Sequence, residues 1–454
     1  MALAITIPAT LLLLYGYVMW ISRKCTYALP FTIVFLIEII WGTISIVWID
    51  HGVYISEQLR YSHFTGAALR YIILIAPFAI IFPWLTNKLI KKDVSNPKKI
   101  TSFKLGNTSR TNQMIWIVGL ACVIYLLTDI AVSGSPLLHN EITKGNFYSL
   151  YSKFPLTETI HNYIIPVFSI FCGFNYAKKS RKGKSVNKYL LVFLAIILYQ
   201  VLLSNKFYGL YDYVVWFLIP VILENIGIFK QKRKIPIKYI ALTLVGVSVF
   251  LYICYNKYTS TAYIRGGNAL QYLLDRIFAL QSHTFWGVDY NVQQGTAGLN
   301  FDTLFSEIIN GFLGVSIINS DFGIAKIMYS VTSSSYADDM ISSGFLFSGS
   351  FATVALSYSG YVITFIFSTL LGYIMANISF ALYKYLRNFD VIGLFFVFWI
   401  YRRFYEFYRV GTLSMVLSWK MIIIYVFVIG LMLYSRGSKR ELQAYNVLER
   451  NPLN

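Results

Sequence analysis

The sequence predicts an all-α, polytopic integral membrane protein. Of the 454 residues, 57% are hydrophobic and only 13% are charged, about half the charged fraction of a typical soluble domain. The mean hydropathy is +0.58, and long apolar runs recur along the chain. A water-soluble globule is therefore excluded.

The apolar runs predict the transmembrane helices. A helix needs about 20 apolar residues to cross the hydrocarbon core of a bilayer, and by that length the chain contains about eleven spans. The first run has no basic segment before it and no small-residue cleavage site after it, so we expect a retained helix and not a signal peptide. The predicted spans are residues 2–21, 28–49, 66–86, 114–133, 160–177, 189–204, 211–229, 239–256, 358–383, 389–405 and 419–435.

The basic residues predict the orientation. With the N-terminus outside, the inner segments hold 26 of the 39 Lys and Arg residues, as the positive-inside rule requires. All five His residues fall in, or at the edge of, outer segments. The net charge of +19 therefore indicates basic cytoplasmic loops and not a nucleic-acid partner.

Four parts follow from this topology. Residues 1–256 carry spans one to eight, and residues 257–357 form a long outer loop. Residues 358–435 carry the last three spans, and residues 436–454 form an inner tail. Loops as long as the outer one are usually functional.

We expect the outer loop to be partly helical. Its apolar residues form two stripes with the helical period, and such helices either lie in the membrane interface or pack on other parts of the outer domain. The segment Gly344–Gly360 predicts a re-entrant or broken helix that leads into the ninth span. The two stripes are Leu270, Leu273, Leu274, Ile277 and Phe278, and Phe301, Leu304, Phe305, Ile308, Ile309 and Phe312.

Arginines near the outer face suggest a phosphorylated ligand, because the planar guanidinium binds phosphate through two hydrogen bonds. Arg402, Arg403 and Arg409 lie where the tenth span is expected to reach the outer face. Three cations there are costly unless they face water or an anion. We interpret them as a cradle for a diphosphate, with Glu406 orienting an arginine or acting as a base. The structural alternative is an interfacial anchor within an aromatic belt.

Three more cations are candidate phosphate ligands: Arg265 and Arg276 on the outer loop, and Lys206 in a short outer hairpin. A lone lysine in such a hairpin also fits a simple marker of the membrane interface. Glu38 is an acid inside the second span and therefore a functional candidate, with Arg70 as its expected partner. A structural hydrogen bond between helices is the alternative for Glu38.

Three outer-loop residues are candidate bases: His283, Asp275 and Asp289. A neutral imidazole near pH 7 can take the proton of a sugar hydroxyl, whereas a hydrogen-bonded loop histidine would be purely structural. The four cysteines lie far apart without zinc-type spacing, and no phosphate-binding loop for ATP and no outer acidic metal motif occurs. We therefore expect chemistry without a metal or another cofactor.

Taken together, the chain resembles the O-antigen polymerase (Wzy-type) family of bacterial oligosaccharide repeat-unit polymerases. Three segments carry the resemblance, in addition to the span count and the large outer loop. They are the basic hairpin LLSNKFYG, the Gly-rich re-entry SGFLFSGSFATVALSYSG and the arginine-bearing span end YRRFYEFYRVG.

The resemblance implies a glycosyltransferase of the bacterial inner membrane that acts on the periplasmic face. Its donor and acceptor would be undecaprenyl-diphosphate-linked oligosaccharides, and its product would be O-antigen for lipopolysaccharide or a similar surface polysaccharide. The implied N-terminus is periplasmic, the C-terminus is cytoplasmic, and a chain-length regulator protein is an implied partner. Two alternatives stay open: an O-antigen ligase-like transferase, which differs in acceptor, and a lipid-linked oligosaccharide flippase, which would place its charges along a central cavity.

Overall fold

The chain forms two compact units: residues 1–106 with 278–454, and residues 107–277. The predicted eighth span, 239–256, lies almost wholly outside the described residues, and the tail 436–454 lies entirely outside them. A computed structural model describes residues 2–95, 108–139, 142, 146–180, 185–205, 207–226, 252, 255, 274–275, 277–314, 322–342, 346–347, 349–388 and 390–430.

Helices make up nearly all of the described structure, which confirms the predicted all-α class. In the described part of the chain, the only sheet is a short antiparallel pair of β1 (Tyr54–Ile55) and β2 (Arg60–Tyr61). Four described helices are long and apolar enough to cross a bilayer, which fits a membrane-embedded protein. They are α2 (Leu29–Ile49), α3 (Ala67–Ser95), the Arg110–Ser133 part of α4 (Thr108–Ser133) and α17 (Phe351–Asn388).

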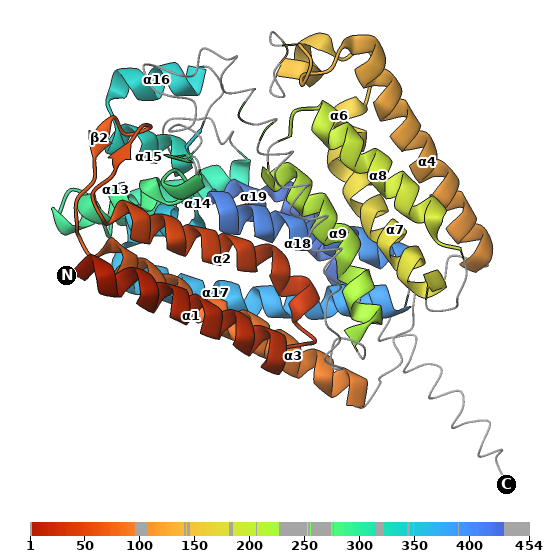
Figure 1. The fold of residues 1–454 in the computed structure, drawn as a ribbon, viewed down its shortest axis with the longest axis horizontal. Coiled ribbons are helices and arrows are strands. Elements are labelled where there is room, and N and C mark those ends of the chain that lie inside the picture. Colours follow the sequence, from red (N-terminus) through yellow and green to blue (C-terminus); the bar gives the residue numbers. More distant parts are fainter. Residues whose placement is uncertain are drawn as a thin grey trace. The chain divides into compact units, whose positions relative to one another are not determined.

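In the first unit, α1 (Ala2–Lys24) packs beside α2, and α3 runs along α17 (Figure 1). Gly372 of α17 permits this close approach, because a Cβ atom there would lie 3.2 Å from the Phe78 Cα atom of α3. The ring of Phe35 then joins α2 to α3 and to α18 (Val391–Val410), with ring centroids 5.3 Å from both Phe78 and Tyr405. These aromatic contacts form the core of the unit.

Helix α17 is broken near its start. Gly360 has φ 69° and ψ −179°, a conformation that only glycine adopts readily. Before the break, the buried Phe351 ring lies 5.2 Å from the ring of Tyr408 in α18. The broken helix expected within Gly344–Gly360 is therefore present, and the long apolar segment follows it.

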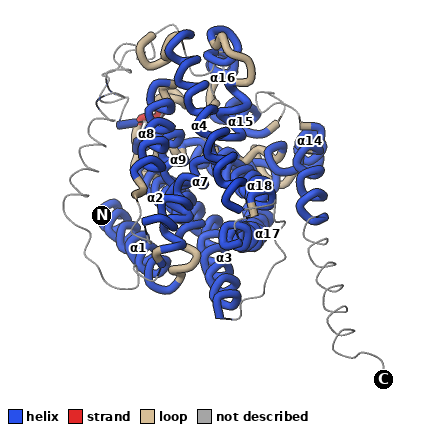
Figure 2. Tube along the Cα trace, turned by 90° about the vertical axis from the view of Figure 1, so that its right-hand side faces the viewer, coloured by secondary structure: helices blue, strands red, loops and turns tan. Residues whose placement is uncertain are grey.

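Several short helices accompany the long helices of the first unit. Helix α14 (Phe301–Leu313) begins where the Asn300 side chain accepts a hydrogen bond from Thr303 N at 3.0 Å, and Gly314 caps its end. Figure 2 shows the trace of α14, which contacts α17 and α19 (Ser414–Leu417). The apolar stripe of α14 is exposed, with Phe301 68% and Phe305 65% exposed. This exposure favours the interfacial alternative over packing on the outer domain. The neighbouring short helices are α13 (His283–Gln293), α15 (Gly323–Val331), α16 (Ser334–Ser342) and α19.

The second unit is a separate helical bundle. Gly173 of α7 lies directly against the Phe217 carbonyl oxygen of α9, so a side chain would not fit there. Ser152 Oγ donates to Asp129 Oδ2 at 2.7 Å and ties a π-helical turn to α4. The elements of the second unit are α4, η1 (Phe147–Tyr151), α6 (Thr157–Thr159), η2 (Ile160–Ile164), α7 (Ile165–Ser180), α8 (Asn187–Leu202) and α9 (Phe207–Glu224).

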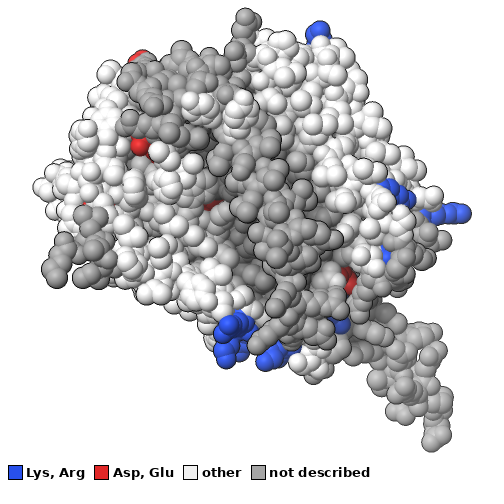
Figure 3. Space-filling view, viewed as in Figure 1, with Lys and Arg blue, Asp and Glu red and all other residues white. Residues whose placement is uncertain are grey.

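The described surface carries few charges on the face shown in Figure 3. Lys and Arg side chains gather there in small groups, mostly near the edge of the view. Such an uncharged surface suits contact with lipid, because hydrocarbon cannot solvate charge.

Candidate functional site

The start of α3 is fixed by an aspartate that follows α2. Asp50 Oδ1 accepts hydrogen bonds from the Thr65 backbone N at 2.8 Å and from Thr65 Oγ1 at 3.1 Å. Its second oxygen lies 3.4 Å from Ala68 N, and Gly66 makes the preceding turn with φ +74°. This capping satisfies amide groups that a helix start leaves without partners, and it positions Arg70 in the first turn of α3.

Arg70 forms a two-pronged ion pair with Asp289 of α13. Arg70 Nε donates to Oδ1 at 2.8 Å, and Nη2 donates to Oδ2 at 2.6 Å. Nη2 also donates to the Thr65 carbonyl at 2.8 Å. The Asp289 side chain has no exposed surface, whereas the Arg70 side chain is 28% exposed. The aspartate therefore fixes the plane of a guanidinium that keeps one accessible edge.

Asp289 also binds two further donors. Tyr361 OH donates to Oδ1 at 3.0 Å, and Gln293 Nε2 donates to Oδ2 at 2.7 Å. Tyr361 follows Gly360 directly, so the break in α17 brings this hydroxyl to α13. Four hydrogen bonds use roughly the full acceptor capacity of a carboxylate. The geometry therefore favours an orienting role for Asp289 over the predicted role of base.

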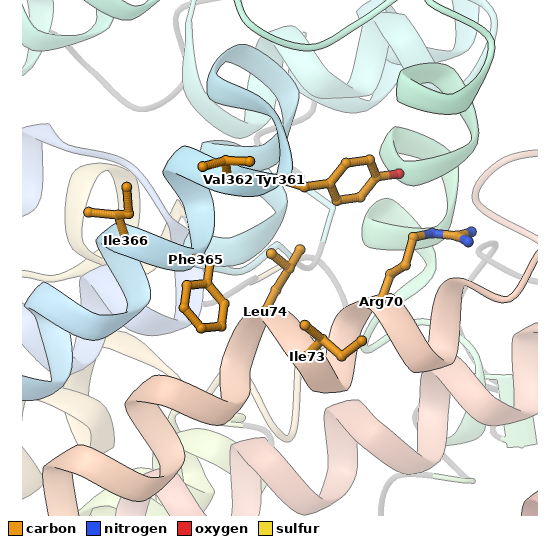
Figure 4. A pocket seen from close by; sticks show the side chains of 7 residues that line it. All are labelled: Arg70, Ile73, Leu74, Tyr361, Val362, Phe365 and Ile366. Carbon is orange, nitrogen blue, oxygen red and sulfur yellow. The ribbon is translucent and has the colours of Figure 1, made fainter.

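An apolar groove of about 350 Å³ extends from Arg70 between α3 and α17 (Figure 4). Arg70 and Tyr361 lie at one end of the groove, and Ile366 lies at the other. Arg70 is the one charged residue in the lining, which is otherwise Ile73, Leu74, Tyr361, Val362, Phe365 and Ile366. The Arg70 guanidinium points away from the apolar side chains, toward α13, beyond this end of the groove (Figure 4). An amphiphile with its chain in the groove could place an anionic head there.

His283 lies in the core and has no exposed surface. Its Nδ1 is 3.1 Å from the Leu280 carbonyl, and its Nε2 is 3.1 Å from Glu57 Oε2. Gln58 Nε2 donates to the His283 carbonyl at 2.7 Å, which ties the segment after α2 to α13. This setting favours a structural role for His283, and its predicted role as base stays a prediction.

The arginines of α18 surround Glu406. Glu406 Oε1 accepts from Arg402 Nε at 2.9 Å, and Oε2 accepts from Arg403 Nη1 at 2.8 Å. Both guanidinium groups lie over the ring of Trp399, at 5.5 and 4.5 Å from its centroid. Of the two predicted roles for Glu406, the geometry favours orienting arginines.

The cluster of Arg402, Arg403 and Glu406 lies beside a different part of α2 than the predicted topology implies. The Tyr401 hydroxyl donates to the Phe31 carbonyl, and the Tyr405 hydroxyl donates to Glu38 Oε1 at 3.2 Å. Both partners lie in the first half of α2, far from its end at Ile49. The cluster was expected at the outer end of its span, but it packs beside the part of α2 that the predicted topology places on the inner side.

The predicted Glu38–Arg70 pair is wrong. Glu38 binds Tyr405, and Arg70 binds Asp289. The reason is their position, since Glu38 lies near the middle of α2 and Arg70 lies in the turn of α3 next to the other end of α2.

The other residues predicted from the sequence lie outside the groove beside Arg70 or outside the described part of the chain. Asp275 belongs to the unit 107–277, where burial raises the pKa of its carboxyl to about 6. Arg265, Arg276 and Lys206 lie outside the described residues. Arg409 lies over the ring of Tyr405, at 5.6 Å from its centroid. No group of three or more His, Cys, Asp or Glu side chains among the described residues is placed to hold a metal ion.

Sequence reasoning missed Glu307 of α14. Its side chain is buried, and Oε2 accepts from Gly323 N at 2.9 Å. Together with Lys326 and Tyr358 it lines a cavity of about 440 Å³. A signal was present in the sequence: Glu307 and Gly311 lie four residues apart on one side of the helix, outside the apolar stripe. Such a face is ordinarily the solvated one, but here it is the buried one.

In comparisons with known proteins, one family model matches part of the chain. Residues 319–425 match a family of unknown function (DUF6418). The match covers about a quarter of the chain and includes Gly360, Tyr361 and the arginines of α18. No curated protein and no solved structure matches the chain.

Proposed function

We propose that this chain is a glycosyltransferase of the bacterial inner membrane, with about eleven spans and a large outer loop. It polymerises undecaprenyl-diphosphate-linked oligosaccharide repeat units on the periplasmic face. The observation that carries the proposal is the apolar groove between α3 and α17 that ends at Arg70. A lipid-linked diphosphate has the matching chemistry, namely a long apolar chain joined to an anionic head.

In this proposal the groove holds part of the lipid chain, and Arg70 binds the diphosphate. Asp289 and Tyr361 keep the guanidinium in place before substrate arrives. Such preorganised charge lowers the barrier most when it faces the charge that develops on the leaving group. The leaving group here is the lipid diphosphate.

The test is gene deletion followed by gel analysis of the surface polysaccharide, with complementation by wild type, Arg70→Gln and Arg387→Gln. Arg387 of α17 is the matched control because it also pairs with an aspartate of α3, Asp93 at 2.7 Å, but lies outside the groove. We expect deletion to reduce the ladder to a core-plus-one-unit band. Wild type and Arg387→Gln should restore the ladder, and Arg70→Gln should not.

Other outcomes of this experiment distinguish the alternatives. Loss of every repeat unit from the lipid A core would indicate a ligase. An unchanged ladder in the deletion strain would discard the polymerase, provided that the strain builds its polysaccharide from lipid-linked repeats.

A flippase is the second candidate, and one observation favours it. Tyr401 and Tyr405 bind the first half of α2, which puts the neighbouring Arg402, Arg403 and Glu406 at that level of the helix, as charges along a translocation path would be. Purified protein in detergent micelles separates the two functions, because micelles have no two leaflets to connect. Polymer formed there from lipid-linked repeat units supports the polymerase. Translocation in vesicles without polymer supports the flippase.

A further inference from the structure

The cavity beside α14 is a polar counterpart to the apolar groove. It is lined by the loop between α13 and α14 and by residues of α14, α15 and α17. Asn300, Thr303 and Ser330 contribute hydrogen-bonding groups to the lining, and Glu307, Lys326 and Tyr358 are its titratable residues. A cavity of this size with several hydrogen-bonding groups suits a sugar.

Glu307 has one carboxylate oxygen that is not used inside the protein. Its side chain is 1% exposed, and Oε2 is held by Gly323 N. Oε1 is buried and has no hydrogen-bond partner in the described part of the chain, and neither has the nearby Thr412 Oγ1. A buried acceptor without a donor costs free energy, so Oε1 is available to a hydroxyl group of a ligand.

The cavity and the groove are close together. Tyr358 lines the cavity, and Tyr361 lines the groove. Their Cα atoms are at most about 11 Å apart, because three consecutive Cα–Cα steps of about 3.8 Å join them. A diphosphate at Arg70 and a sugar in the cavity can therefore belong to one reaction.

We propose that the cavity binds the terminal sugar of the acceptor and that Glu307 is the catalytic base of the transfer. This inference rests on the proposed function. The acceptor hydroxyl oxygen forms a bond to the anomeric carbon of the donor, and the bond from that carbon to the phosphate oxygen breaks. The electron pair leaves with the lipid diphosphate, and the hydroxyl proton moves to Glu307 Oε1.

The protonation behaviour of Glu307 agrees with this role. Burial raises the pKa of its carboxyl to about 7, although the Gly323 hydrogen bond and the charge of Lys326 act in the opposite direction. A base works best when its pKa lies near the working pH.

The test uses purified full-length protein and lipid-linked repeat units, with chain extension followed on gels. Glu307→Gln should lower the extension rate by about 10²- to 10⁴-fold and leave KM for the lipid-linked donor unchanged. The wild-type rate should rise with pH and level off above about pH 7, whereas the residual rate of the variant should not follow this curve. Asp302→Asn is the matched control, because Asp302 is an exposed acid on the same helix.

A second variant separates chemistry from folding. In Glu307→Ala, added formate can occupy the vacated space and accept the proton, so it should restore part of the rate. Formate would not rescue a protein whose defect is only structural. Wild-type rates in both Glu307 variants, or a lost rate that formate leaves unchanged in folded Glu307→Ala, would overturn the inference and leave the proposed function standing. Wild-type protein that makes no polymer would overturn both.

Discussion

At the residue scale, two arginine–aspartate pairs show how burial determines the contribution of an ion pair to the free energy of unfolding. Asp289 has no exposed surface and accepts four hydrogen bonds, whereas Asp93 is 8% exposed and its partner Arg387 is 41% exposed. Removing the charge of a buried partner costs about 3 kcal/mol or more, while exposed pairs contribute at most about 1 kcal/mol. We therefore expect Asp289→Asn to lower the free energy of unfolding by about 3 kcal/mol and Asp93→Asn by a smaller amount, because Arg387 is the more exposed arginine of the two.

Unfolding of both variants in the same detergent, followed by circular dichroism, checks this difference. Equal losses would show that Asp289 does not act as the buried anchor of Arg70.

Glu307 gives a prediction about stability and pH. Its pKa is about 7 in the folded protein and 4.5 in the reference state, so folding favours the protonated carboxyl. This contribution to stability is complete below about pH 4.5 and is lost as the pH rises through about 7. The shift corresponds to about 3 kcal/mol. Relative to Glu307→Gln, the wild type should therefore become less stable from pH 5 to pH 8 and change little above that range.

Melting temperatures of the two proteins across this pH range measure the effect. A constant difference between them would mean that the Glu307 carboxyl keeps its ordinary pKa in the folded protein.

The sequence identified the right kinds of residue but not their partners. Asp289 was a predicted base, and its partner Arg70 lies 219 residues away in the chain. No local spacing reveals such a pair, and Arg70 was assigned to Glu38 because both lie in or near spans. Glu406 was predicted correctly as a neighbour of Arg402, because a spacing of four residues on one helix is visible in the sequence.

At the element scale, the break in α17 depends on Gly360. A Cβ atom there meets only Leu299 N, at 3.7 Å, so space is not the obstacle. The obstacle is the backbone, because φ 69° with ψ −179° is strained for any residue with a side chain. We expect Gly360→Ala to lower the unfolding free energy by about 1–3 kcal/mol and to weaken the Tyr361–Asp289 contact.

Gly16→Ala is the control for this change. Gly16 lies inside α1, and a Cβ atom added there would meet nothing within 4 Å, so alanine should be neutral or stabilising. Thermal unfolding of the two variants side by side distinguishes conformational strain from a general effect of adding a methyl group. A neutral Gly360→Ala would indicate that the break tolerates an ordinary residue.

Helix α14 gives a prediction about the membrane. Phe305 is 65% exposed on the apolar face, and Asp302 lies on the exposed polar side of the first turn. If the stripe lies in lipid, a cysteine at 305 should be protected from a water-soluble, membrane-impermeant thiol reagent in vesicles, and a cysteine at 302 should react. Both variants are made in a chain without other cysteines, and detergent should remove the protection. Equal labelling in vesicles would place the stripe in water.

The sequence predicted the amphipathic stripe of α14 and the broken helix before the ninth span, because periodicity and glycine content are local signals. It did not predict which face of α14 is buried. Glu307 and Gly311 are buried there, and the usual expectation for a polar face would expose them. Packing partners decided the outcome: Gly311 fits against Leu413, and Glu307 binds Gly323.

For the whole molecule, composition alone predicted the helical membrane class. The relative depth of the helices was not predictable in this way. Helix α18, which carries Arg402 and Arg403, is held against α2 by aromatic packing between Phe35, Tyr401 and Tyr405. Hydropathy assigns each span a length but not a level relative to its neighbours, so a cluster expected at one end of a span lies beside the first half of α2.

The orientation of the whole chain is the last prediction. The positive-inside rule places residues 96–107 inside and the loop around Gly52 outside. A reporter that is active only in the periplasm should therefore be active when inserted at Gly52 or Gly298 and inactive near Lys104. It should also be inactive after Arg387, because residues 351–388 cross the membrane only once if the part before Gly360 is re-entrant. Activity after Arg387, together with activity at Gly298, would mean that the segment before Gly360 is a full crossing. In that case every later segment would change sides, and the arginines of α18 would approach the diphosphate from the opposite face.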